Sequence, residues 1–401
     1  MVSPAANPSG IRCDRGRTAA RPVALDTVTG ERREVASDPV VDPWPVYHHD
    51  RRPIGAWFSG ATQRLAFFDE DSDEARLQHL LQRSFPGSRA SMRSSSQDGR
   101  LRVVLVESDV DPGTFYLFDT EKRGASMIVA RDDQIDSERM SPMKPIELKA
   151  RDGLALHGFI TLPAGSGGKG LPMVVVPHGG PFGVADAWGF DRDVQLLAAS
   201  GYAVLQVNFR GSSQYGRAFK QAGAREWGGK MQDDVTDATR WAIEQGYADP
   251  QRICIYGASY GAYAALMGSV REPALYRCAI GYVGLYDLPY QQREVARTSR
   301  SNATWAGDWM GTDAAALAAA SPSRRADEIR IPVFLAAGGE DFITPIEHTR
   351  RMESALKRAG VPVEALYYPN EGHGFYEVAH RREFYTRMLQ FLARHIGAGQ
   401  G

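Results

Sequence analysis

A serine flanked by glycines is the first chemical feature of the sequence. Residues 257–261 read Gly-Ala-Ser-Tyr-Gly, after an apolar run at 253–256 and before a helix-forming run at 262–265. A G-x-S-x-G motif between a strand and a helix is typical of a nucleophile elbow, a sharp turn that raises the serine hydroxyl above a sheet. Small residues around Ser259 would let the strand and the helix approach each other. A purely structural turn is the alternative interpretation.

A serine hydroxyl is a poor nucleophile without a base, and the base needs an acid that orients it. Both should follow the serine along the chain, each on a loop after a strand. Asp341 closes a glycine-rich loop after one apolar run, and His373 lies in a glycine-rich loop after the next. The sequence therefore predicts that Ser259, Asp341 and His373 form a catalytic triad at the carboxyl edge of a sheet.

Other histidines and acids compete for these two roles. Glu340 is the alternative acid, and Asp341 is preferred because it leads directly into the start of a helix. His178 is the other histidine that lies on a glycine-rich loop after a predicted strand, whereas His348 should lie exposed on the helix after Asp341. Surface or packing roles suffice for His48, His49, His79, His157, His380 and His395.

Acyl transfer also needs two N–H donors aimed at the oxygen that becomes negative. The backbone N–H of Tyr260 is one candidate, because it lies at the positive end of the helix after the nucleophile. The second donor should come from residues 178–181, His-Gly-Gly-Pro, which follow another apolar run. Gly180 is the preferred residue there, and His178 is expected to shape the loop rather than to transfer protons.

The elements that must position these residues begin near residue 143. An Asp-Gly pair at 152–153 between two alternating runs predicts a hairpin. Apolar runs then alternate with amphipathic segments, which predicts an α/β fold with a mostly parallel sheet and helices on both faces. The expected strands cover 173–176, 203–208, 253–256, 279–282, 333–336 and 363–368, and two of the expected helices cover 233–245 and 383–395.

One further helix carries boundary signals at both ends. Thr344 fits an N-cap, Pro345 a first-turn proline and Glu347 a capping-box acid. Gly360 fits the stop at its C-terminal end.

The first 142 residues show short β-rich runs separated by Gly, Asp and Pro. Residues 23–27 and 116–120 resemble each other, and each string is followed by a turn and another strand candidate. This repetition suggests blades of a β-propeller, with chance similarity as the alternative. A helix with Leu77, Leu80 and Leu81 on one face interrupts the region. The expected strands cover 23–26, 65–68, 101–107 and 114–118.

Composition limits the classes of function. The chain has 401 residues, enough for two domains, and a net charge of −1, which argues against nucleic acid or an anionic membrane as a partner. No apolar run approaches ~18 residues, and the first residues do not form a secretory signal, so a cytoplasmic protein is expected. Cys254 and Cys278 are expected to be buried thiols, and Cys13 lies in a polar leader.

The motifs together resemble the prolyl oligopeptidase family of serine peptidases, in its acylaminoacyl-peptidase-like branch. The matching strings are residues 178–181, 208–212 with 215–216, 257–261, 339–341 with 344–345, and 371–375. The resemblance implies hydrolysis of peptide or acyl-peptide bonds by Ser259, Asp341 and His373, with no metal or organic cofactor. The resemblance also implies that the remaining motif residues lie near the site, with a bracing structural role as the alternative. These candidate site-lining residues are His178, Gly179, Asn208, Arg210 and Tyr215.

The N-terminal region is similar to the last blades of the family's propeller, on the strings at 85–87, 107–109 and 111–117. A blade takes about 40–45 residues, so only two or three blades would fit before residue 142. The expected domains are a disordered leader at 1–20, a partial propeller at 21–142 and an α/β-hydrolase domain at 143–398. A truncated start could hide a signal peptide, and exposed strand edges would favour association of copies.

Three functions remain open from the sequence. A serine peptidase acting on small peptides or acyl-peptides is the main hypothesis. A carboxylesterase would use the same triad on esters, which have a better leaving group than amides. A remnant without catalysis that serves as an interaction module is the third, and the intact motifs argue against it.

Overall fold

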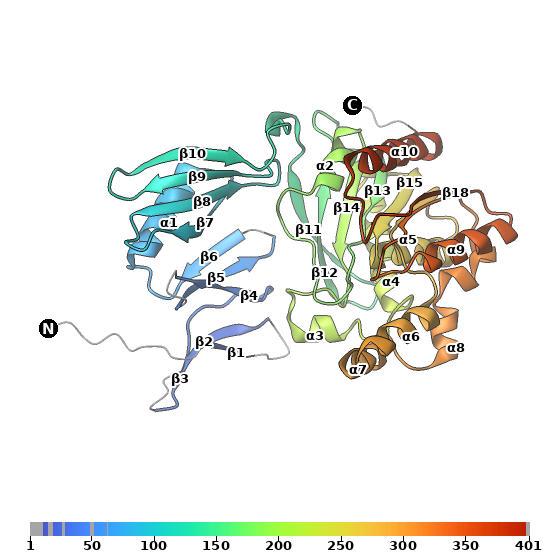
Figure 1. Ribbon diagram of the computed structural model, residues 1–401, viewed down its shortest axis with the longest axis horizontal. Coiled ribbons are helices and arrows are strands. Elements are labelled where there is room, and N and C mark those ends of the chain that lie inside the picture. Colours follow the sequence, from blue (N-terminus) through green and yellow to red (C-terminus); the bar gives the residue numbers. More distant parts are fainter. Residues whose placement is uncertain (1–10, 15–18, 26–28, 49–51, 62, 398–401) are drawn as a thin grey trace. The chain divides into compact units, whose positions relative to one another are not determined.

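The structure is a computed structural model that describes residues 11–14, 19–25, 29–48, 52–61 and 63–397 (Figure 1). The chain divides into two compact units. The first unit comprises the described residues up to Met143 together with two later segments, Ala187–Arg192 and Gln214–Ala218. The second unit comprises the remainder of the described residues, and it contains Ser259, Asp341 and His373.

The second unit is built on one eight-stranded sheet, whose strand order is β11-β12-β14-β13-β15-β16-β17-β18. Strand β12 runs antiparallel to β14, and the strands from β14 to β18 are parallel to one another. The strands are β11 (Met143–Lys149), β12 (Ala155–Thr161), β13 (Leu171–Val175), β14 (Ala203–Asn208), β15 (Ala248–Ala258), β16 (Cys278–Tyr282), β17 (Val333–Gly338) and β18 (Val363–Tyr368). The predicted α/β class, the hairpin and the six expected strands are confirmed.

Helices cover both faces of this sheet, as the fully buried strands require. The helices after β13 in the chain are α2 (Arg192–Ala199), α3 (Gly216–Gln221), α4 (Lys230–Glu244), α5 (Tyr260–Arg271), α6 (Leu288–Thr298), α7 (Arg300–Trp309), α8 (Ala314–Ala319), α9 (Glu347–Arg358) and α10 (Val378–Ile396). Short 3₁₀ turns cover Ser137–Arg139, Pro322–Arg324 and Ala326–Glu328. Helices α4 and α10 correspond to the two helices predicted at 233–245 and 383–395.

Alternate strand residues face opposite helix layers. One face packs Val174, Tyr256, Ile280 and neighbouring strand residues against α2 and α10, in a core that includes Phe384. Ile255 faces the other way, where its Cδ1 would lie 3.5 Å from a Cβ built on Gly268 of α5. Because successive strand residues point to opposite faces, each strand contributes side chains to both layers.

Two buried cysteines depart from the expectation. Cys254 of β15 and Cys278 of β16 are register partners with Cα atoms 4.8 Å apart, and their sulfur atoms are paired in a disulfide. The prediction of two separate thiols is therefore wrong. The disulfide forms because the two parallel strands are aligned so that both cysteine side chains lie on the same face of the sheet at the same level.

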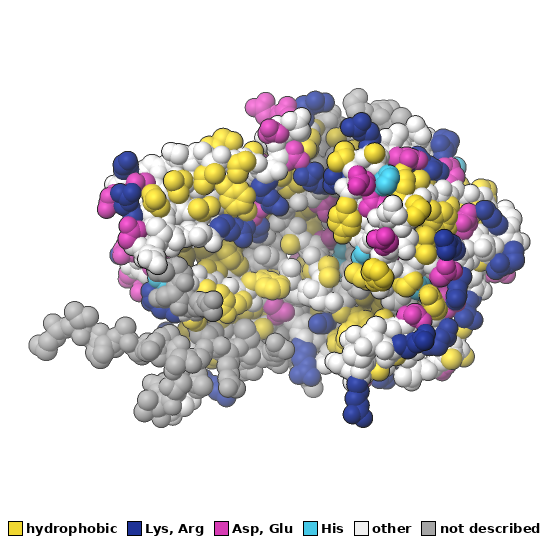
Figure 2. Space-filling view, in the orientation of Figure 1, with side chains coloured by type: hydrophobic (Ala, Val, Ile, Leu, Met, Phe, Trp, Pro, Cys, Tyr) yellow, Lys and Arg dark blue, Asp and Glu magenta, His cyan; other side chains and the backbone are white. Residues whose placement is uncertain are grey.

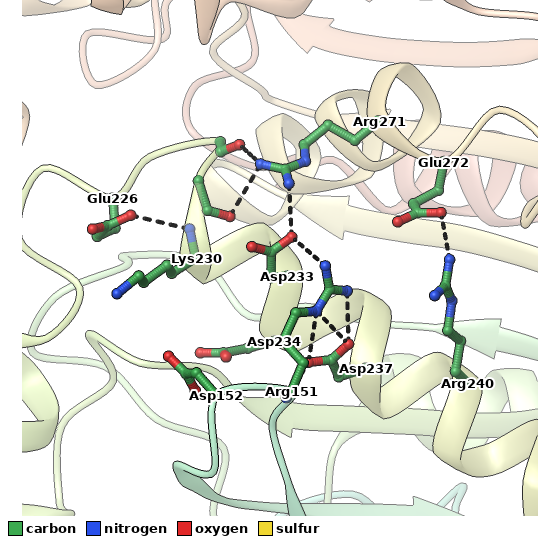
Figure 3. Close-up of polar contacts among 12 residues, drawn as sticks. Arg151, Asp152, Glu226, Lys230, Asp233, Asp234, Asp237, Arg240, Arg271 and Glu272 are labelled. Carbon is green, nitrogen blue, oxygen red and sulfur yellow. Dashed lines mark hydrogen bonds and ion pairs between the residues drawn. The ribbon is translucent and has the colours of Figure 1, made fainter.

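A network of charged side chains ties the hairpin turn to α4 and α5 (Figure 3). Arg151 in the turn pairs with Asp237 at 2.7 Å and with Asp233 at 3.1 Å, both on α4. Arg271 at the end of α5 pairs with the same Asp233 at 2.7 Å. The Asp233 carboxylate thus joins the β11–β12 turn to helix α5, which begins directly after Ser259.

The first unit consists of small antiparallel sheets. Their orders are β1-β2-β3, β4-β5-β6 and β10-β9-β8-β7. The elements are β1 (Ile11–Asp14), β2 (Arg21–Leu25), β3 (Arg32–Glu34), β4 (Pro43–Tyr47), β5 (Pro53–Ser59), β6 (Gln63–Phe67), α1 (Asp73–Ser84), β7 (Arg89–Ser95), β8 (Leu101–Glu107), β9 (Thr114–Asp119) and β10 (Gly124–Ala130). Leu77, Leu80 and Leu81 of α1 pack on the four-stranded sheet, as their spacing predicts.

Within the predicted leader at 1–20, Ile11–Asp14 forms β1 and pairs with β2, while residues 1–10 and 15–18 lie outside the described residues. The predicted domain boundaries stay a prediction. The propeller origin of the three sheets stays a prediction. None of the helices in the described part of the chain combines the length and the hydropathy that a membrane span requires.

Candidate active site

Ser259 occupies a strained turn between β15 and α5. Its backbone has φ 57° and ψ −121°, a left-handed conformation that residues other than glycine rarely adopt. The helix begins at the next residue, Tyr260, so Ser259 stands at the N-terminal end of α5. The geometry agrees with the nucleophile elbow that the motif predicts.

The glycines of the motif are needed for close packing. A Cβ on Gly257 would lie 2.3 Å from the carbonyl carbon of Gly261, and a Cβ on Gly261 would lie 2.2 Å from Pro177 O. Both distances are too short for any side chain. Gly257 therefore lets the strand and the helix meet at this sharp angle, and Gly261 lets the helix approach the loop after β13.

The loops after β17 and β18 bring Asp341 and His373 into contact. His373 Nδ1 lies 2.8 Å from Asp341 Oδ2. The other carboxylate oxygen of Asp341 accepts the N–H groups of Ile343 and Thr344, each at 2.9 Å. Glu340, the alternative acid, is exposed and is held through its backbone N–H instead.

Asp341 stays ionised in this setting. Burial favours its neutral form, but hydrogen bonds from His373 and from the Thr344 N–H outweigh burial and lower the pKa of Asp341. The ionised Asp341 Oδ2 accepts a hydrogen bond from Nδ1–H of His373, so Nε2 of the neutral ring is left as an acceptor. The His373 side chain is 23% exposed.

Tyr282 at the end of β16 links the serine turn to the base loop. Its carbonyl accepts the N–H of Ser259 at 2.9 Å, and its hydroxyl accepts the N–H of Phe375, two residues after His373. Among the described residues, the Ser259 hydroxyl makes no hydrogen bond to the His373 ring. Catalytic hydrogen bonds are often long without substrate and tighten in the bound complex.

Glycines before Asp341 allow its loop to approach the base loop. A Cβ on Gly338 would lie 2.2 Å from Glu371 O, and a Cβ on Gly339 would lie 2.3 Å from Pro369 O. The backbone N–H of Glu340 also donates to Glu371 O at 2.9 Å. The acid and the base are thus fixed by direct contact between their two loops.

The His-Gly-Gly-Pro loop lies beside the serine. A Cβ on Gly179 would lie 3.6 Å from Ser259 Cβ, and Gly180 has φ +113°, which favours glycine. His178 is buried against Phe209, with its Nδ1 2.7 Å from Gly179 O and its Nε2 2.8 Å from Ser212 Oγ. Burial lowers the pKa of His178 to about 4, so its ring is neutral and fits the expected role in shaping the loop.

The remaining motif residues have structural partners. Arg210 is buried and pairs with Asp234 and Asp152 at 2.7 Å each. Asn208 exchanges two hydrogen bonds with the backbone of Asp186, at 2.8 and 2.9 Å. These contacts agree with the bracing alternative.

Tyr215, the last predicted site-lining residue, belongs to the first unit. There it packs against the cluster of Val41, Ala56 and Phe58. Its place in the site stays a prediction.

Two expectations about the helix after Asp341 are wrong. His348 is fully buried rather than exposed, and it accepts the N–H groups of Tyr286 and Asp287. Helix α9 begins at Glu347 after Ile346, and Thr344 does not cap it. Thr344 Oγ1 instead lies 2.8 Å from Asp341 Oδ2 and 2.7 Å from Val283 O, so the residue serves the acid. The expected stop is present, because Gly360 follows the helix with φ +73°.

Sequence reasoning missed three residues that hold the site. Tyr282, Thr344 and Glu371 all contact the backbone or side chain of a predicted triad loop. Thr344 lies three residues after Asp341, and Glu371 lies two residues before His373. These positions inside the motifs were the only sequence signal of a role in the site. Among the described residues, no group of three or more histidine, cysteine or acidic side chains is placed to hold a metal ion.

The strand order, the turn at Ser259 and the loops after β17 and β18 define an α/β-hydrolase. Residues 188–399 match the prolyl oligopeptidase family, and the chain belongs to this family. The family predicted from the motifs is therefore confirmed.

The most similar proteins include peptidases of two kinds. Dipeptidyl aminopeptidase BIII of Pseudoxanthomonas mexicana is 30% identical over 411 residues, which cover 96% of this chain and 57% of that protein. An acylamino-acid-releasing enzyme of Arabidopsis thaliana is 31% identical over 215 residues, which cover 51% of this chain and 28% of that enzyme. Several curated relatives match most of this chain, and the chain spans about half of their length.

Solved structures agree on the fold. A puromycin-hydrolysing peptidase of Mycobacterium tuberculosis matches with a TM-score of 0.78 at 20% identity, covering 96% of this chain and 60% of that one. The acylaminoacyl peptidase of Pyrococcus horikoshii matches with a TM-score of 0.73 at 19% identity, covering 96% and 61%.

Proposed function

We propose that the chain is a serine peptidase that hydrolyses peptide or acyl-peptide bonds through Ser259, His373 and Asp341. The observation that carries the proposal is the 2.8 Å contact between Asp341 Oδ2 and His373 Nδ1. Tyr282 ties the loop of His373 to the serine turn. The contact with Asp341 holds the imidazole with Nε2 free to accept a proton. The names of the relatives support peptides as the substrate class.

The reaction follows from these positions. Ser259 Oγ attacks the carbonyl carbon while its proton moves to Nε2 of His373, and Asp341 stabilises the imidazolium that forms. The oxygen that becomes negative is bound by the N–H groups of Gly180 and Tyr260. The C–N bond then breaks as His373 passes the proton to the leaving amine, and an acyl-enzyme remains.

Water completes the cycle. It attacks the acyl carbon while His373 accepts its proton, and the carboxylic acid product leaves when that proton returns to Ser259. No cofactor is required by these steps.

The test is replacement of the nucleophile. Ser259→Ala should lower turnover of aminoacyl and acetyl-aminoacyl anilides by about 10⁴- to 10⁶-fold and remove labelling by a fluorophosphonate, because only the attacking oxygen is lost. Ser269→Ala is the matched control, since this serine lies on the same helix and donates to Ala265 O. Persistent labelling of the Ser259 variant would defeat the assignment. Turnover of esters without any turnover of anilides would favour the carboxylesterase.

A further inference from the structure

Glu371 is a buried carboxylate that the proposed reaction does not use. It lies between β18 and α10, two residues before His373, and is 1% exposed. We propose that Glu371 is a positioning residue that holds His373 in place for proton transfer. This inference rests on the proposed function, because it assigns a role for a residue that acts through the base.

The side chain of Glu371 closes the loop that carries the base. One oxygen accepts the N–H of Tyr376 at 2.7 Å. The other accepts the N–H of Glu377 at 3.0 Å and lies 2.7 Å from His380 Nδ1. Both backbone donors come after His373 in the chain. The carboxylate of Glu371 therefore closes a loop from residue 371 to residues 376 and 377, and this loop contains the base.

The backbone of Glu371 fastens the same loop to the acid. Its carbonyl accepts the N–H of Glu340 at 2.9 Å, and Glu340 precedes Asp341. One residue therefore joins the acid loop through its main chain and the far side of the base loop through its side chain. Displacement of Glu371 would therefore alter the position of His373 relative to the acid loop and to the residues that follow His373.

The segment between these fastenings has little stiffness of its own. His373 stands between Gly372 and Gly374, and Gly374 has φ +136°. Glycine restricts the backbone least, so the position of the ring depends on contacts at the ends of the segment. The Glu371 carboxylate supplies one such contact, and the Tyr282 hydroxyl supplies another through Phe375.

The charge of Glu371 is matched to this role. Burial opposes ionisation, but the Tyr376 N–H, His380 and the Glu377 N–H lower the pKa of Glu371. The carboxylate also lies at the N-terminal end of α10, where the helix dipole favours negative charge. His380 is in turn stacked on Tyr368, with ring centroids 3.7 Å apart. An ionised acceptor can serve three donors at once, which a neutral amide cannot.

The test is Glu371→Gln in the full chain. The amide keeps the shape, but its nitrogen cannot accept an N–H, so at least one donor loses its partner. We expect kcat for an anilide to fall by about 10- to 100-fold with little change in KM, since small misplacement of a catalytic group has effects of this size. The fluorophosphonate labelling rate should fall by a similar factor, and the downfield proton resonance of His373 Nδ1–H should broaden or disappear. Glu371→Asp, which keeps the charge on a shorter side chain, should recover part of the labelling rate.

A matched control separates positioning from packing. Glu353→Gln alters another largely buried carboxylate, which accepts the Tyr367 hydroxyl and pairs with Lys357 on α9. It should change the midpoint of unfolding and leave the labelling rate unchanged. If Glu371→Gln does not fold, His380→Ala removes one donor and should lower kcat about 3- to 10-fold.

The outcomes distinguish the two proposals. A wild-type chain that neither turns over substrate nor reacts with the probe would defeat the serine peptidase, whatever the variants do. An active wild type with unchanged kcat, labelling rate and proton resonance in Glu371→Gln would overturn the role of Glu371 alone.

Discussion

His348 shows how a single buried residue makes stability depend on pH. Its Nδ1 accepts the N–H groups of Tyr286 and Asp287, at 3.1 and 3.3 Å, and its Nε2 lies 2.9 Å from Gln291 Oε1. Burial lowers the pKa of His348 to about 4 from its ordinary value of 6.5. The neutral ring is therefore the form that fits, because Nδ1 must accept rather than donate.

We expect the free energy of unfolding to decrease as the pH falls from about 6.5 towards 4. In this window the unfolded chain binds a proton at His348 that the folded chain does not, so acid favours unfolding. The contribution of His348 should decline by about 2 kcal/mol between pH 7 and pH 5. His178, which is also buried with a lowered pKa, should add to the slope.

Urea unfolding at several pH values measures this effect. His348→Gln keeps an acceptor for the backbone donors and removes the titration, so its stability should depend less steeply on pH than that of the wild type. A variant with the full wild-type slope would show that His348 does not titrate in this way.

At the scale of elements, the buried pair of Arg210 and Asp234 joins the end of β14 to α4. The guanidinium donates to both oxygens of Asp234, at 2.8 and 2.7 Å, and the Asp234 side chain is fully buried. Asp152 in the hairpin turn accepts hydrogen bonds from the other edge of the guanidinium. Arg210 lowers the pKa of Asp152 to about 2. Three elements thus share one cation.

We expect Asp234→Asn to destabilise the protein by about 3 kcal/mol or more, because removing one partner leaves a buried charge poorly compensated. Glu272→Gln is the control. It breaks the exposed pair with Arg240, seen in Figure 3, and should cost less than about 1 kcal/mol. Equal shifts of the urea midpoint in the two variants would contradict the assignment of Arg210 as a brace.

These elements also show why much of the fold could be predicted from the sequence. The strands of the second unit are apolar runs, and the turn between β11 and β12 carries an Asp-Gly pair, so both signals are local. The start of α9 could not be predicted in the same way. Thr344 has the chemistry of an N-cap, but the neighbouring Asp341 and Val283 offer its hydroxyl better partners in the folded chain.

At the scale of the whole molecule, apolar side chains remain exposed on an edge strand of the first unit. Met127, Ile128 and Val129 of β10 are 62%, 52% and 53% exposed, and Figure 2 shows hydrophobic side chains gathered over this sheet. Strand β10 pairs with β9 on one side, with an irregularity between Met127 and Val129. Exposed apolar groups on an edge strand favour association of copies.

We expect the wild-type chain to associate reversibly as its concentration rises, and Met127→Lys to weaken this association. Sedimentation velocity at several concentrations measures it. Ser126→Lys is the matched control, because it adds the same charge on the same exposed strand and removes no apolar surface. If both variants weaken association equally, charge rather than the apolar surface governs it, and a monomeric wild type would contradict the prediction.

Features of this protein that depend on neighbouring residues could be read from the amino-acid sequence alone. The turn around Ser259, the glycine-rich loops before Asp341 and around His373, and the alternation of strands and helices are all set within a few positions of the chain. Short-range sterics and hydrophobic periodicity act over that distance, which is why these features were predicted correctly.

Contacts between residues far apart in the chain became visible in the folded protein. The register of β15 and β16 paired Cys254 with Cys278, and the packing of α9 buried His348. The approach of two loops placed the backbone of Glu371 against the acid loop. Such contacts depend on surfaces that come together after the sheet has formed, and no short stretch of sequence specifies its partner across that distance.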